Sequence, residues 1–154
     1  MIRRAESKDI DKINMLLRQV LDVHYKGRPD IFKSNAKKYN DEELIEIINN
    51  DNKPIFVHEE NGEIDGYCFC VIQQHTNNNI LTDIKTLYID DLCIDENARG
   101  RHIGTQLFEY VKKYAQEIDC YNVTLNVWYE NKNALKFYEK LQFKPQKIGM
   151  EIIL

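Results

Sequence analysis

Residues 99–105 read RGRHIGT, and the segments on either side of this loop set the order of the fold. The apolar stretch Thr86–Ile94 before it is typical of a buried strand, and the spacing of Leu107, Val111 and Ala115 after it predicts an amphipathic helix. A glycine-containing loop that leads into a helix offers free backbone N–H groups and the positive end of the helix dipole to an anion. The loop lacks the ending of a P-loop and the glycine spacing of a dinucleotide fingerprint. By itself it is equally well explained as a turn with solvated arginines.

Hydrophobic periodicity predicts the other elements. The pair Asn61-Gly62 between two apolar segments is typical of a type I′ hairpin. The aperiodic segment Arg28–Tyr39 is a candidate substrate-facing loop. The remaining predicted elements are helices over Ser7–Lys26 with Ser7 as N-cap, over residues 41–48 with Asn40 or Asp41 as N-cap, and over Asn131–Leu141, and strands Pro54–Glu59, Glu63–Ile72, Tyr121–Trp128 and Lys147–Leu154.

This order indicates one domain over residues 1–154, of the α+β class. We expect a three-layer α/β/α arrangement, in which a mixed, mostly antiparallel sheet of about seven strands carries about four helices on its two faces. A chain of this length buries ~68–70% of its unfolded surface, so its core needs neither disulfides nor a structural metal.

The composition excludes several classes of protein. A net charge of -4 argues against a dedicated nucleic-acid binder, which needs a basic face. No apolar run approaches the ~18–20 residues of a membrane span, and the charged start is not a secretion signal. The four cysteines contain no Cys-x-x-Cys pair and the four histidines are scattered, which favours free thiols and no metal site. We therefore expect a cytoplasmic protein without a metal or a membrane contact.

A second pattern lies near the end of the chain. Asn133 stands at the expected start of a helix, and Phe137, Tyr138 and Phe143 follow it. Core packing is the simpler explanation for the two phenylalanines. A buried Tyr138 hydroxyl, in contrast, needs a hydrogen-bond partner.

The two patterns together resemble the GNAT N-acetyltransferase superfamily. The loop matches its Arg/Gln-x-x-Gly-x-Gly/Ala acetyl-CoA signature at Arg99, Ile103 and Gly104. The later segment matches its Asn-x-x-Ala-x-x-Phe-Tyr-x-x-x-Gly-Phe pattern, with Asn131 and Ala134 as the first pair. The order of helices and strands is also that of the family, so the resemblance covers nearly the whole chain.

Two residues depart from the family pattern. His102 and Gln142 stand where the family usually has glycine. A helix N-terminus tolerates a Cβ atom, so His102 should still permit diphosphate binding. Gln142 requires that the turn after the last helix avoid a left-handed conformation, or accept a cost of about 1 kcal/mol.

The resemblance implies transfer of an acetyl group from acetyl-CoA, as co-substrate, to an amine. It implies that the diphosphate lies on the loop amides, that the pantetheine pairs with the strand before the loop, and that an N–H near Cys93 or Ile94 is the oxyanion donor. It also implies that Tyr138 is the general acid for the departing thiolate. The implied cofactor-binding residues are Leu92, Cys93, Ile94, Arg99, Gly100, Arg101, His102, Ile103, Gly104, Thr105, Asn131, Asn133, Ala134 and Phe137.

The acceptor amine adds a requirement, because an ammonium group must lose its proton before it can attack. Asp90 and Asp91 lie before the loop as the candidate base, with Asp90 as first choice and Asp91 as second. Adjacent strand residues point to opposite faces unless a bulge redirects them. It is equally possible that both acids only bind an ammonium group or cap backbone.

Two alternatives stay open at this stage. One is a non-catalytic acyl-CoA-binding or sensing module, and the other is a phosphate-binding α/β domain that uses a different nucleotide. The acids at positions 90 and 91 and in the Glu42-Glu43 region suit a cationic amine. Arg28 and the lysines of Tyr25–Tyr39 suit an acidic partner equally well, so small amines and protein N-termini or lysines stay open, with the small amine slightly favoured. A homodimer is compatible with the sequence.

Overall fold

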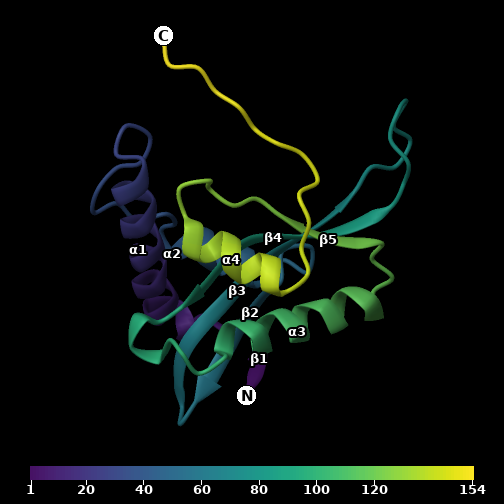
Figure 1. The fold of residues 1–154 in the computed structure, drawn as a ribbon. Helices are drawn as coiled ribbons and strands as arrows, with labels where there is room; N and C mark the ends of the chain where they lie inside the picture. Colours follow the sequence, from purple (N-terminus) through teal and green to yellow (C-terminus); the bar gives the residue numbers. More distant parts are fainter.

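A sheet of five strands, in the order β1-β2-β3-β4-β5, forms the middle of the molecule (Figure 1). The computed structural model describes residues 1–154. All neighbouring strands are antiparallel except β4 and β5, which run parallel. The strands are β1 (Ile2–Arg4), β2 (Ile55–Glu60), β3 (Glu63–Gln74), β4 (Lys85–Ile94) and β5 (Asn122–Leu125).

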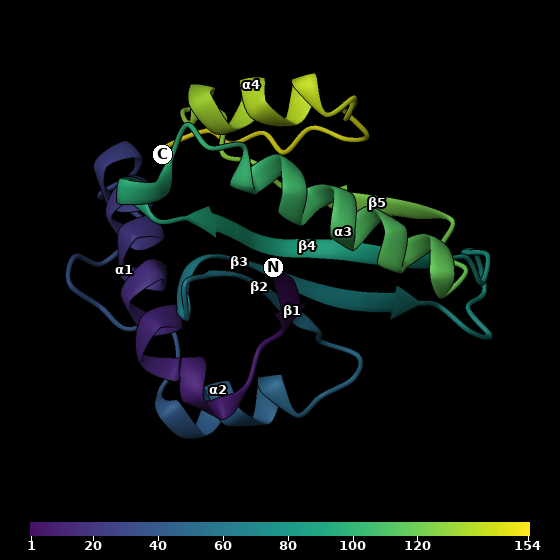
Figure 2. The same cartoon turned by 90° about the horizontal axis from the view of Figure 1, so that it is seen from below.

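Helices cover both faces of the sheet, which confirms the three-layer arrangement and the mixed sheet (Figure 2). On one face, α1 and α2 pack over a cluster that includes Ile13, Leu44 and Tyr67. On the other, α3 packs over a cluster that includes Leu87 and Leu107. The helices are α1 (Ile10–Gly27), α2 (Asp41–Ile48), α3 (Ile103–Glu117) and α4 (Lys132–Lys140), with 3-10 turns at Ser7–Asp9 and Glu96–Ala98. None of the four helices combines the length and the apolar character that a membrane crossing requires.

Local hydrogen bonds explain where the first two helices begin. Asn40 caps α2: its Oδ1 accepts from the Glu43 N–H at 2.8 Å, and its own N–H donates to the Glu43 carboxylate at 3.2 Å. The prediction of Ser7 as N-cap of α1 is wrong. Glu6 and Asp9 instead form a capping box around a 3-10 turn, in which the Glu6 N–H donates to Asp9 Oδ2 at 2.8 Å, and α1 begins at Ile10.

A β-bulge in β4 exchanges the faces on which its side chains lie. Ile89 pairs with Cys70 and Asp91 with the adjacent Phe69, so Asp90 is an extra residue in the ladder. Before the bulge, Ile89 packs toward α3. After it, Cys93 packs toward α1, although an unbroken alternation would have placed these two odd-numbered residues on one face.

Three strand predictions are corrected by the structure. The sheet has five strands and not about seven, and β1 was not anticipated. The strand predicted over Tyr121–Trp128 is limited to β5, because the chain turns away from β4 after Leu125. The strand predicted over Lys147–Leu154 is absent: this segment pairs with no strand of the sheet and extends away from it (Figure 1).

Both departures from the family's glycines adopt left-handed backbone. His102 has φ 60° at the N-cap of α3, and Gln142 has φ 72° after α4. Gln142 therefore does not avoid the left-handed conformation, and the chain accepts the cost of a Cβ atom there. The turn is nevertheless ordered by the N–H of Phe143, which donates to the Tyr138 carbonyl at 3.1 Å.

The change Gln142→Gly should stabilise the protein by about 1 kcal/mol, because glycine adopts this conformation without a Cβ clash. A thermal melt should show a rise of roughly 2–4 °C. Gln116→Gly, in the helical backbone of α3, is the matched control and should lower the melting temperature. A fall for both variants would contradict the assignment of strain to Gln142.

Candidate functional site

The parallel pairing of β4 with β5 ends partway along β4, because β5 ends at Leu125. They pair only from Thr86 with Asn122 to Ile89 with Leu125. Beyond this point β4 keeps β3 as its neighbour on one side and has no strand on the other. The backbone N–H and C=O groups of Asp90–Ile94 on that side are therefore available to an extended ligand, as an edge strand would be.

The N-terminus of α3 follows this open stretch directly. No side chain caps it and no acidic residue lies in its first turn. The first N–H groups of a helix have no intrahelical partner, and the dipole adds positive character to this end. Gly100, with φ 82°, and His102 turn the loop so that it enters the helix at this point. The arrangement suits a phosphate group.

A close contact joins the two sequence patterns. A Cβ atom on Gly104 would lie 3.1 Å from Cζ of Phe137, so a larger residue there would require the Phe137 ring of α4 to shift by a few tenths of an ångström. Asn131 fixes the start of α4, because its Oδ1 accepts from the Ala134 N–H at 3.2 Å. The loop and α4 therefore flank the open part of β4 together.

The two arginines of the loop differ in their surroundings. Arg101 forms an ion pair with Glu60 at the end of β2. Arg99 is exposed and forms no ion pair within the chain, so its guanidinium can meet a ligand phosphate. Asn133 is exposed at the start of α4, whereas Ile103 is buried and contributes only its backbone.

The bulge places the two predicted acids beside Lys38 of the segment between α1 and α2. Asp90 accepts from Lys38 Nζ at 3.4 Å, and Asp91 accepts from the Tyr67 hydroxyl at 2.7 Å. Adjacent strand residues were expected to point to opposite faces unless a bulge redirects them, and the structure has a bulge at this position. Tyr67 was not identified from the sequence, and Lys38 was considered there only as one of the positive charges that suit an acidic partner.

Burial raises the pKa of the Asp91 carboxyl above its ordinary value, and it outweighs the opposing effects of the Tyr67 hydroxyl and the Lys38 ammonium. The same pair of acids raises the pKa of Lys38 despite its partial burial. Asp91 is therefore a stronger base than an exposed aspartate, and Lys38 remains charged at neutral pH.

Tyr138 of α4 and Cys93 of β4 are both protonated at neutral pH. Burial, with smaller contributions from Cys68, Asp91 and Cys93, raises the pKa of the Tyr138 phenol well above its usual range. Burial also raises the pKa of the Cys93 thiol to about 12. Cys93 is thus a thiol at neutral pH, which disfavours a covalent acyl-cysteine route.

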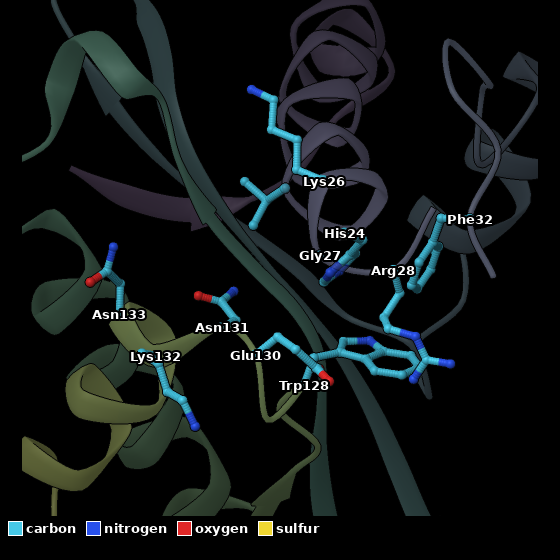
Figure 3. A pocket seen from close by; sticks show the side chains of 11 residues that line it. His24, Lys26, Gly27, Arg28, Phe32, Trp128, Glu130, Asn131, Lys132 and Asn133 are labelled. Atoms are coloured by element: carbon cyan, nitrogen blue, oxygen red, sulfur yellow. The ribbon is translucent and has the colours of Figure 1, made fainter. Parts of the chain in front are cut away.

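A cavity of about 350 Å³ lies between the end of α1 and the start of α4 (Figure 3). One side is an aromatic cluster: His24 stacks on Phe32 at 4.9 Å, and Trp128 meets Phe32 edge to face at 5.3 Å. Burial and Lys38 lower the pKa of His24, so its ring is neutral at pH 7. The aromatic residues were missed in the sequence because they come from two segments about 100 residues apart.

The predicted residues form three groups around the open edge of β4, and five further residues join them. The groups are the bulge acids with Tyr138, the open edge itself, and the loop with the start of α4. Within this part of the molecule no group of three or more histidine, cysteine or acidic side chains is arranged to hold a metal ion. The five further residues, none of which was predicted for this site individually, are His24, Phe32, Lys38, Tyr67 and Trp128. Phe32 and Lys38 lie in Arg28–Tyr39, the segment that was expected to face the substrate.

Comparison with known proteins identifies related sequences. The profile of the Acetyltransferase (GNAT) family matches residues 19–143. Glucosamine 6-phosphate N-acetyltransferase 1 of Dictyostelium discoideum is 31% identical over 70 residues, which are 46% of this chain and 43% of that protein. An N-alpha-acetyltransferase of Sulfurisphaera tokodaii is 28% identical over 150 residues, 96% of this chain and 81% of its own. The alignments span between 43% and 64% of the length of the first three curated relatives.

A solved structure shares the whole fold. A tetramutant of the BH1408 protein from Bacillus halodurans superimposes with a TM-score of 0.95 at 32% sequence identity. The match covers 100% of this chain and 99% of the other. The fold described above is therefore found in a protein determined by X-ray crystallography.

Because the raised pKa of Asp91 means that its ionised form is costly in the folded state, Asp91→Asn should stabilise the protein at pH 7, by about 0.5–2 kcal/mol. The gain should disappear as the pH falls below 3.8, the ordinary aspartate value, where the carboxyl is protonated in both states. Urea unfolding at several pH values measures both effects.

Asp9→Asn is the matched control with the opposite sign. Burial opposes the ionisation of Asp9, but hydrogen bonds from Arg3 and the Glu6 N–H outweigh it and lower its pKa. This variant should lose stability at pH 7, and the loss should fade as the pH falls through the lowered pKa of Asp9. A destabilised Asp91→Asn variant at pH 7 would count against a costly carboxylate.

Proposed function

Because this chain belongs to the Acetyltransferase (GNAT) family, we propose that it is an enzyme that transfers the acetyl group of acetyl-CoA to a primary amine. One observation carries the proposal: the open edge of β4 lies between an uncapped helix N-terminus and the half-buried carboxylate of Asp91. The N-terminus of α3 suits a diphosphate, the open edge of β4 suits a pantetheine amide chain, and the carboxylate suits an ammonium group.

The residues present fit acetyl-CoA. The amides of Ile103, Gly104 and Thr105 would hold the diphosphate, with Arg99 and the start of α4 beside it. Five lysines and two glutamates in Glu130–Lys147 add positive charge near an anionic ligand. When bound, acetyl-CoA supplies the thioester. An N–H of Leu92–Ile94 on the open edge would donate to the thioester oxygen as negative charge develops there.

We assign the base to Asp91 rather than Asp90, which reverses the order expected from the sequence. A general base works best when its pKa approaches the working pH, and burial raises the pKa of Asp91. Asp90 is more exposed and faces Lys38, so it orients that lysine and attracts the cationic acceptor. The proton lost by the ammonium passes to Asp91, directly or through water.

Tyr138 is the proposed general acid. Its raised pKa keeps the phenol protonated at neutral pH, so that a proton is available for the thiolate as it leaves. The raised pKa of Cys93 supports direct attack by the amine, since no thiolate stands ready at the open edge.

A small amine is the favoured acceptor. The cavity of about 350 Å³ has the size of a small-molecule site, and a related protein is named for glucosamine 6-phosphate. A protein N-terminus is the second candidate, supported by the relative named an N-alpha-acetyltransferase, whose alignment spans almost this whole chain.

One experiment distinguishes an acetyltransferase from a non-catalytic acyl-CoA-binding module. Calorimetry should show acetyl-CoA binding to wild type and to Tyr138→Phe alike, whereas amine-dependent release of CoA should fall by about 10²–10⁴-fold in the variant. A panel of amino sugars, polyamines, aminoglycosides and short peptides supplies the acceptors. ATP in excess should not displace acetyl-CoA.

Absence of acetyl-CoA binding would overturn the cofactor assignment. Binding without CoA release for any acceptor would favour the sensing module. Unchanged turnover in Tyr138→Phe would leave the transferase assignment in place and remove the general acid.

The lysine beside the acids allows a test of the base. Lys38→Met removes the ammonium that favours the ionised form of Asp91, so its pKa should rise further. The acidic limb of the pH profile of kcat/KM should then move to higher pH. Lys37→Met is the matched control, because Lys37 pairs with Asp41 at 2.9 Å and should leave the limb in place. An equal shift in both variants, or in neither, would exclude the role of Asp91.

A further inference from the structure

The cavity between the end of α1 and the start of α4 is lined mainly by positive charge (Figure 3). Lys26, Arg28 and Lys132 line it, and Glu130 is the one acid among the lining residues. His24 adds no charge at neutral pH, because burial lowers the pKa of its ring. A field of this sign attracts an anionic group and repels a second ammonium group.

The guanidinium of Arg28 is fixed on one edge and has donors left on the other. Asp30 accepts from Nε at 2.9 Å and from Nη2 at 2.8 Å, which uses one edge of the planar group. The outer edge, formed by Nη1 and the second hydrogen of Nη2, is not needed by Asp30. Its two donors lie side by side and match two oxygens of a carboxylate or a phosphate.

A replaceable carboxylate meets this outer edge. Glu151 accepts from Nη1 of Arg28 through one oxygen and from Nη2 at 3.2 Å through the other. It belongs to the extended C-terminal segment, which makes no backbone hydrogen bond to the rest of the chain after that of Phe143. The Glu151 side chain is about half exposed, and exposed ion pairs contribute little to stability. A ligand anion can therefore take its place at low cost.

Lys38 connects the bulge acids with this cavity. It donates to Asp90 at 3.4 Å, and it lies near enough to His24 to lower the pKa of that ring. Phe32 and Trp128 add aromatic surface beside His24. The region therefore offers carboxylates to an ammonium group, aromatic side chains to a compact body, and a guanidinium edge to an anion.

We propose that the acceptor is a zwitterionic small amine, whose ammonium group meets the acids at positions 90 and 91 and whose carboxylate or phosphate replaces Glu151 on Arg28. The inference rests on the proposed acetyl transfer and names the class of its acceptor. Polyamines and aminoglycosides, whose charges are all positive, should be poor acceptors, because Lys26 and Lys132 lie where their further ammonium groups would come.

Pairs of amines that differ only in the anionic group test the proposal. Glucosamine 6-phosphate is compared with glucosamine, and 4-(aminomethyl)benzoate with benzylamine, in CoA release by the full chain. For at least one pair, kcat/KM should be about 10–100-fold higher for the anionic member, and the pair concerned tells phosphate from carboxylate. Arg28→Met should abolish the preference by raising KM for the anionic amine alone. Glu151→Gln should lower that KM several-fold, because the competing carboxylate is gone.

Arg18→Met is the matched control, since Arg18 is an exposed arginine of α1 outside the cavity, and it should leave the preference unchanged. Calorimetry of the four amines with wild type and Arg28→Met separates this inference from acetyl transfer. If no amine is acetylated, acetyl transfer fails, whereas binding of an anionic amine that is lost in Arg28→Met still supports the anion site. Equal affinity within both pairs, no binding of either anionic amine, or a preference that survives in Arg28→Met would overturn the inference.

Discussion

The separation of β4 from β5 after their fourth residue pair is the constraint on which the site depends. A sheet that stayed paired would satisfy every backbone group of Asp90–Ile94 and leave no place for an extended ligand. Two features border the opening. The bulge lies at Asp90, where the pairing of β4 with β5 has just ended, and Gly104 at the start of α3 lies close to Phe137 of α4. The loop, α4 and the acids therefore surround the opening.

The bulge also decides the chemistry of the acids. The extra residue turns Asp91 toward Tyr67 and α1, where burial opposes its ionisation. The raised pKa makes Asp91 a stronger base, but its ionised form lowers the stability of the fold. Such a trade-off between stability and activity is common at functional sites. Lys38 limits the cost, since its charge pairs with Asp90 at 3.4 Å and favours the ionised form of Asp91 as well.

The sequence was a good guide wherever local rules decide the structure, and a poor one where distant segments meet. Helical periodicity and the Asn61-Gly62 turn predicted most of the helices and strands. The glycine-containing loop 99–105 and the pattern over residues 131–143 predicted the region of the site. The bulge, in contrast, depends on how β4 pairs with β3, which no local pattern records. Lys38, Phe32 and Trp128 reach the site through tertiary packing. The terminal strand was wrong because alternation indicates a strand but does not supply its neighbour.

His102 and Gln142 likewise adopt a backbone conformation that their side chains disfavour, because the tertiary structure requires it. His102 adopts φ 60° although it pays a steric cost there, and the helix that follows begins at Ile103 with its amides uncapped. A residue in ordinary helical or extended backbone would carry the chain past this point in another direction. The strain at His102 is thus tied to the entry of α3, and a strained residue is expected where a backbone must present its N–H groups at a set angle. Gln142 has no such ligand-facing role, and its strain serves only to return the chain so that Phe143 packs on Phe108.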